Sequence, residues 1–343
     1  MCSWHLWRCL GFSFRCFCLV PLYTMGFSQK PYKLMKAIVM KFLTTRAFGL
    51  FAAIATVMIW AAFMLITRSA VQGDFTVEEI LVLRLIPGLI VMMPVMWKLG
   101  IMPIGQSWPR AIILMIGASA VSPYIISMGL AYAPASDGGA LAPGMLPFWT
   151  ALAAYALAGD FPGPRRRFGL GMILVGAMVV SLWPILSGVS DGGWKGHLLF
   201  LTGSGLWAVY SVIFRQSGLT PLHGMVIGLF WGALIITPLL LVSGNVSFAG
   251  ADWSDIVAMV ILQGFVIGIM AMVLFSYAVR LLGAAESAAF GALTPILALL
   301  GGVLFLGESV TYLKIFGIIL VAVGVFLASG IIRKNHPSAR PLL

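Results

Sequence analysis

Two ionisable side chains lie within long apolar stretches of the sequence and are its first candidates for chemistry. Arg84 falls about eight residues into the stretch 77–97, roughly 10 Å deep at the helical rise. There it could hold a substrate carboxylate or phosphate through paired hydrogen bonds, or brace neighbouring helices against carbonyls or an acid. Glu286 could attract a cationic group or carry a coupling proton, or pair with Arg280. Both roles stay open for each residue.

Aromatic pairs form a second set of candidates. Trp60 and Phe63 are one helical turn apart, and Trp207 and Tyr210 repeat this spacing. Membrane tryptophans usually lie at the lipid–water interfaces, whereas these two fall in mid-stretch. Such pairs could stack on a flat or apolar substrate, although ordinary helix packing explains them as well.

Prolines interrupt two of the most apolar stretches at corresponding places. Pro147 precedes Trp149, and Pro295 follows Thr294. A proline removes a backbone donor and disturbs the carbonyl one turn earlier, and in a bilayer that carbonyl needs a partner in protein or in a wet cavity. Interrupted spans of this kind indicate the binding site of a transporter. The alternative is that the prolines only bend their helices.

Composition decides which elements must position these residues. The 343 residues are 61% hydrophobic and only 9% charged, whereas a soluble domain has roughly 25% charged residues. Apolar stretches of about 20 residues match the thickness of a bilayer. We therefore predict an all-α membrane protein with ten transmembrane helices over approximately 47–67, 77–97, 109–132, 137–158, 166–186, 195–215, 222–243, 254–279, 284–306 and 311–331.

The basic residues predict the orientation of these spans. With the N-terminus in the cytoplasm, all 21 lysines and arginines except Arg68, Arg84, Lys195 and Lys314 fall on the cytoplasmic side. That distribution is typical of membrane proteins, so the net charge of +11 does not indicate nucleic acid. We expect an integral protein of the inner, cytoplasmic membrane with both termini in the cytoplasm.

The first segment, 1–46, differs from the rest and holds all four cysteines within its first 18 residues. Its only apolar run is interrupted by Arg15, and it has no clear signal-peptide cleavage site. It reads as a cytoplasmic leader or as an extension upstream of a start at Met35 or Met40. We expect it to precede two repeats, 47–186 and 195–332, which a cytoplasmic tail, 333–343, follows.

The repeats emerge when the sequence is shifted against itself. A shift of 148 residues sets Pro147 on Pro295, Gly159 on Gly307, Asp160 on Glu308, Gly169 on Gly317 and Gly176 on Gly324. A shift of 147 sets Trp60 on Trp207 and Phe63 on Tyr210. A unit of five spans is odd, so its second copy enters the membrane from the opposite side. The sequence therefore predicts two inverted five-helix repeats, an architecture common among secondary transporters.

Several segments resemble a known family. The stretch ESAAFGALTPILALLGGVLFLGESVTYLKIFGIILVAVGVFL, together with MIWAAFMLITRSA and GSGLWAVYSVIFRQ, is similar to the EamA-type members of the drug/metabolite transporter superfamily. The resemblance covers roughly 47–332. It implies ten helices around a central cavity and movement of small metabolites, often outward, without a bound cofactor. Asp160 departs from the glutamate common at that place in such repeats.

These observations favour a secondary transporter, most simply an exporter, of a small organic metabolite such as an amino acid or a derivative. No phosphate-binding loop, GxGxxG motif or usable catalytic set is present, so we expect no cofactor and no metal. Transport would be driven by the substrate gradient, a proton or an exchanged substrate. A passive channel and an intramembrane lipid-modifying enzyme are the alternatives. The unit in the lipid is either a monomer or a homodimer.

Overall fold

The computed structural model describes residues 44–186 and 192–331. The predicted leader and tail therefore lie largely outside the described residues, as do the four cysteines. The chain divides into two compact units, 1–48 and 49–343. In the first, the backbone N–H of Phe48 donates to Thr45 Oγ1 at 3.2 Å. All that follows concerns the second unit.

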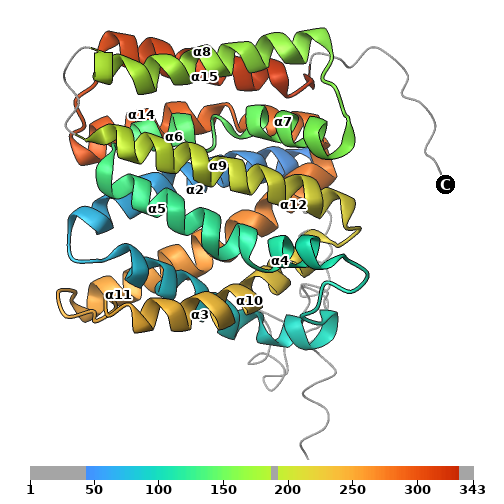
Figure 1. The fold of residues 1–343 in the computed structure, drawn as a ribbon, viewed down its shortest axis with the longest axis vertical. Helices are drawn as coiled ribbons and strands as arrows, with labels where there is room; N and C mark the ends of the chain where they lie inside the picture. The colour runs from blue at the N-terminus through green and yellow to red at the C-terminus, as the bar shows by residue number, and fades with distance from the viewer. Residues whose placement is uncertain (1–43, 187–191, 332–343) are drawn as a thin grey trace, which may run out of the picture. The chain divides into compact units, whose positions relative to one another are not determined.

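The fold is built of helices throughout the described residues (Figure 1). In chain order they are α2 (Arg46–Gln72), α3 (Val77–Leu99), α4 (Trp108–Ile116), η3 (Gly117–Val121), α5 (Ser122–Tyr132), α6 (Ala135–Leu141), α7 (Leu146–Ala158), α8 (Pro164–Leu186), α9 (Gly193–Gln216), α10 (Pro221–Val242), α11 (Trp253–Met259), η4 (Val260–Met270), α12 (Ala271–Leu282), α13 (Ala284–Phe290), α14 (Leu293–Leu306) and α15 (Tyr312–Ala328). Within the described ranges, eight helical stretches are long and apolar enough to cross a membrane. The two remaining predicted spans, 166–186 and 311–331, correspond to α8 and to the shorter apolar helix α15.

Two predicted spans contain π-helical segments at matching places. The third predicted span is α4, η3 and α5 in sequence, and the eighth is α11, η4 and α12. A π-helical turn adds a residue to the helical repeat and often accompanies a functional site. Both segments occur near the middle of their spans.

The fourth and ninth predicted spans are interrupted as the proline positions indicated. The fourth breaks between Leu141 and Leu146, where α6 ends and α7 begins. The ninth breaks between Phe290 and Leu293. Helices α7 and α14 end in the same way. Gly159 and Gly307, the residues after them, both adopt left-handed backbone conformations, with φ of 67° and 64°. The backbone N–H groups of Asp160 and Glu308 then donate to the carbonyl oxygens of Ala154 and Gly302 at 3.3 and 3.0 Å.

Helices α8 and α15 pack antiparallel and show the relation between the repeats directly (Figure 1). A Cβ on Gly169 would lie 2.8 Å from the carbonyl oxygen of Gly324, and one on Gly176 would lie 2.6 Å from that of Gly317. These four glycines are the ones that the 148-residue shift superposes, Gly169 on Gly317 and Gly176 on Gly324. A contact that exchanges equivalent positions in this way is what a twofold axis between two inverted copies produces.

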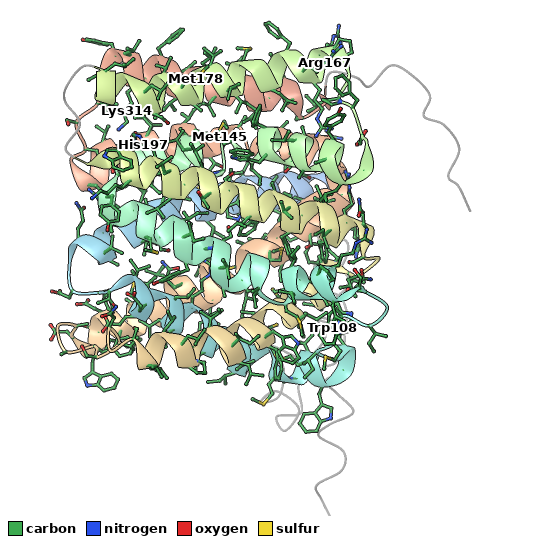
Figure 2. All side chains as sticks on the ribbon, viewed as in Figure 1. Trp108, Met145, Arg167, Met178, His197 and Lys314 are labelled. Atoms are coloured by element: carbon green, nitrogen blue, oxygen red, sulfur yellow. The ribbon has the colours of Figure 1, made fainter. Side chains whose placement is uncertain are left out.

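Polar contacts between helix starts and loops define one end of the second unit. The start of α3 contacts the loop after α10, since Glu79 accepts from the backbone of Ser247. His197 near the start of α9 and Lys314 near the start of α15 both reach Asp137 near the start of α6. We call this the Asp137 end, and the opposite one the Trp108 end; Figure 2 labels His197 and Lys314 at the first, Arg167 and Trp108 at the second.

Candidate functional site

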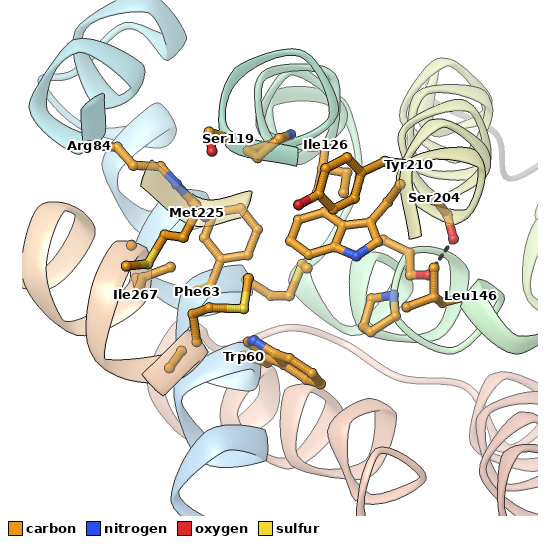
Figure 3. A pocket seen from close by; sticks show the side chains of 18 of the residues that line it. Trp60, Phe63, Arg84, Ser119, Ile126, Leu146, Ser204, Tyr210, Met225 and Ile267 are labelled. Atoms are coloured by element: carbon orange, nitrogen blue, oxygen red, sulfur yellow. Dashed lines mark hydrogen bonds between the residues drawn. The ribbon is translucent and has the colours of Figure 1, made fainter. Parts of the chain in front are cut away.

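A central cavity of about 130 Å³ lies between the two repeats (Figure 3). Residues near the middle of seven spans contribute to its wall, which includes both π-helical segments and the break between α6 and α7. Its lining residues are Trp60, Phe63, Met64, Arg84, Ser119, Pro123, Ile126, Ala142, Pro143, Leu146, Ser204, Trp207, Tyr210, Met225, Leu229, Ile267, Gly268, Ala271 and Met272.

The two repeat-related aromatic pairs meet in this cavity. Trp60 and Phe63 enter from α2, and Trp207 and Tyr210 enter from α9. Trp60 also contacts Phe275 with ring centres 5.3 Å apart. Four ring systems from inverted elements therefore give the cavity two aromatic sides that can hold an apolar group by area and by ring stacking.

Arg84 is the single charged residue in this wall. Its guanidinium carbon lies 5.2 Å from the centre of the Phe63 ring, a cation–π distance. Its Nη1 atom is buried and has no hydrogen-bond partner among the residues that the structure describes. The bracing role that the sequence left open would need a carbonyl or an acid at this atom, and none is found there in the described part of the chain.

The polar atoms of the cavity are few. Ser204 Oγ donates to the carbonyl oxygen of Ala142 at 2.7 Å, across the break after α6 (Figure 3). This bond satisfies one of the carbonyls that the broken helix leaves open. The hydroxyls of Ser119 and Tyr210 also lie in the wall.

Five of the ten predicted site residues do not line this cavity. Pro147 and Trp149 lie on α7 beyond the lining residue Leu146, and Trp149 packs edge-on against Phe148 at 5.6 Å. Thr294 and Pro295 are buried on α14. Glu286 lines a separate groove beside α15.

The Asp137 end carries two polar groups that span the repeats, which the sequence reasoning did not join. Glu308, at the end of α14, accepts from the backbone N–H groups of Ala135 and Ser136 at 2.6 and 3.1 Å and from Ser136 Oγ at 2.6 Å. This satisfies donors at the start of α6, where a helix favours negative charge. Glu308 therefore caps a helix that belongs to the other repeat.

The second group is centred on Asp137, which is 5% exposed. Its Oδ1 lies 2.7 Å from Lys314 Nζ, and its Oδ2 lies 3.0 Å from His197 Nε2. His197 is as buried as Asp137, with 5% of its surface exposed. The predicted spans contained a signal for this cluster, because Asp137, His197 and Lys314 all lie near the starts of spans at the same side of the membrane.

Comparison with known proteins identifies the two repeats. The model of the EamA-like transporter family matches residues 47–182 and again 194–330. An uncharacterized transporter of Bacillus subtilis (strain 168), YyaM, is 27% identical over 217 residues, which cover 60% of this chain and 68% of that protein. A solved structure titled "Crystal structure of protein" shares the fold with a TM-score of 0.57 and 18% identity, covering 84% of this chain and all of that one.

Proposed function

Because the chain belongs to the EamA-like transporter family, which is a family of membrane transporters and not of enzymes, we propose that it is a secondary transporter working by alternating access. Its cargo is a small organic metabolite, an amino acid or a derivative. The observation that carries this proposal is the central cavity, because both inverted repeats contribute aromatic and polar side chains to it.

The contacts at the Asp137 end support a gate that is closed there. Glu308 ties α14 to α6, and Lys314 and His197 tie α15 and α9 to the same short helix. Arg68 Nη1 also donates to the carbonyl oxygen of Leu130, joining α2 to α5. A substrate leaving the cavity towards this end would have to break these charge-assisted bonds together.

The repeat-related position at the other end supports an asymmetric state. Asp160 superposes on Glu308, yet its side chain is exposed and has no hydrogen bond among the described residues. Inverted repeats provide two gates of one design, and alternating access requires that they differ at any moment. A state in which Glu308 is bonded at the Asp137 end, while Asp160 at the opposite end makes no equivalent bond, is one of the two states that alternating access needs.

The distribution of lysine and arginine supports an orientation with the Asp137 end outside the cell and the Trp108 end in the cytoplasm. The cavity would then load from the cytoplasm in this state, which suits an exporter of the cytoplasmic membrane. Reporter fusions in the loops after α2 and after α9 test the orientation, because the proposal needs them on opposite sides.

Transport itself is tested with the full chain in proteoliposomes. Metabolites that accumulate differently inside and outside cells with and without the protein supply the substrates to try. A transporter gives saturable uptake and counterflow, whereas a passive channel gives neither. Counterflow that is absent for every substrate that crosses would favour the channel alternative and contradict the proposal.

A further inference from the structure

The chemistry of the central cavity narrows the class of substrate. The starting point is Arg84, whose stem passes Gly268 of η4; a Cβ on that glycine would lie 3.9 Å from Arg84 Cγ. The guanidinium meets the face of Phe63 on one side. This contact does not use the hydrogen-bonding capacity of the buried Nη1, which has no partner among the described residues and can donate to another group.

No acid among the lining residues balances this charge. The other polar side chains of the wall are hydroxyls and indoles, and an indole N–H can only donate. The cavity therefore presents one fixed positive charge and a majority of donors. In surroundings of low dielectric such a set favours an anion strongly, because an unpaired buried charge costs several kcal/mol.

A free ammonium group would fit this cavity poorly. The hydroxyl oxygens of Ser119, Ser204 and Tyr210 are the side-chain acceptors in the wall, and the Ser204 Oγ–H already donates to the carbonyl oxygen of Ala142. None of these three hydroxyls carries a negative charge. The carboxylate of an amino acid would thus favour binding, whereas its ammonium would oppose binding, because it would be buried near Arg84 without a counter-ion.

The size and the walls define the remainder of the molecule. An apolar protein cavity of roughly 150 Å³ takes up benzene, and this one has a volume of about 130 Å³. Trp60 and Tyr210, labelled in Figure 3, approach it from different repeats. One ring or a branched chain of similar size would be held between such surfaces.

We propose that the cavity binds small organic monoanions that carry one ring-sized apolar group and no free ammonium, with Arg84 holding the acid group. This inference rests on the proposed transport function and refines it, because it selects derivatives that lack the free amine over amino acids themselves. Organic acids and N-acylated amino acids belong to the class.

Four probes with nearly the same skeleton test the charge requirement. Phenylacetate is a monoanion, phenylglycine adds an ammonium, phenylacetamide is neutral and phenethylamine is a cation. Binding to the purified full chain in detergent is measured by quenching of tryptophan fluorescence and by thermal stabilisation. We expect phenylacetate to bind about tenfold or more tightly than each of the others, as a charge-assisted hydrogen bond implies.

Variants then assign the preference to Arg84. Arg84→Met should lower the affinity for phenylacetate to that for phenylacetamide. Arg84→Lys, which retains the positive charge, should retain part of the difference in affinity between these two probes. The control is Arg167→Met, since Arg167 lies over Phe161 at 5.3 Å but is exposed on α8, outside the cavity. It should leave all four affinities unchanged.

Two outcomes would overturn the proposal: phenylglycine binding as tightly as phenylacetate, or a preference for the anion that survives in Arg84→Met. Failure of all four probes to bind the unaltered chain would overturn it too. None of these results touches the transport function, which would fail separately if proteoliposomes showed no counterflow with any metabolite.

Discussion

Glu308 and Ser136 are 172 residues apart and are joined by two hydrogen bonds, from the backbone N–H at 3.1 Å and from Oγ at 2.6 Å. Glu308 follows the end of the ninth predicted span, and Ser136 precedes the start of the fourth. This contact joins the two repeats at the Asp137 end, and the same two repeats line the central cavity, which neither forms alone.

Removing the charge of Glu308 should open this end. In Glu308→Gln one oxygen acceptor becomes a donor facing the backbone N–H groups of α6, so the closed state loses charge-assisted bonds worth about 1.5–3 kcal/mol. With Cys2, Cys9, Cys16 and Cys18 replaced by serine, Ile126→Cys reports on the cavity. Its labelling by an impermeant thiol reagent applied at the Asp137 end should rise about tenfold or more.

Asp160→Asn is the matched control for that substitution, because Asp160 is the repeat-related residue and is exposed. It should leave labelling from the Asp137 end unchanged. An equal increase in the labelling rate of Ile126→Cys by both substitutions would mean that Glu308 has no specific role in closing the cavity.

Breaking the buried ion pair at Asp137 should destabilise the protein. Lys314→Met leaves the carboxylate with His197 alone, and loss of one partner of a buried pair typically costs about 3–5 kcal/mol. The double variant Asp137→Asn, Lys314→Met should regain much of the loss in thermal unfolding. Additive effects of the two single substitutions would show that the side chains are not coupled.

The glycine contacts of α8 and α15 predict a stability effect separate from binding. Gly176→Leu would drive a side chain into the backbone of Gly317, and overpacking of this kind costs about 1–3 kcal/mol or more. Gly171→Leu on the same helix is the control, since a Cβ there meets no atom within 4 Å. Phenylacetate affinity should not change in either, because no lining residue comes from α8 or α15. Equal melting temperatures for the two variants would contradict the close packing.

Substrate flux should depend on the aromatic pairs that line the cavity. Trp60→Ala and Trp207→Ala should each reduce flux about tenfold or more, because each removes a buried aromatic face whose ring contacts contribute about 0.5–1.5 kcal/mol beyond the buried area. Trp108→Ala should have little effect, since Trp108 is 78% exposed at the far end. Comparable losses in all three would remove the cavity from the transport path.

The sequence pattern grouped the aromatic side chains that the structure brings into the cavity wall, and it did so for a physical reason. Trp60, Phe63, Trp207 and Tyr210 repeat with one spacing inside apolar stretches, so the pattern itself marked a shared environment. The prolines correctly predicted the breaks in the two spans. They did not identify the lining of the cavity, which includes Pro143 and Leu146 but not Pro147 or Pro295.

Contacts between the repeats could not be derived in the same way. That Glu308 caps α6, or that Lys314 and His197 share Asp137, depends on how the helix ends of two separate units come together. The sequence placed these residues at one side of the membrane, but it contains no periodic signal for which acid meets which partner. The hydroxyls of Ser119 and Ser204 were missed because a single serine in an apolar helix has no pattern of its own.

The central claim, a cavity open to one end at a time, is tested most directly by locking the Asp137 end. Cysteines at Ser136 and Glu308 in the cysteine-free chain can be joined by a short bifunctional thiol reagent that reduction removes. We expect that cross-linking stops counterflow in proteoliposomes, that reduction restores it, and that phenylacetate applied at the Trp108 end still binds while the link is in place. Undiminished counterflow through the cross-linked protein would contradict the central claim.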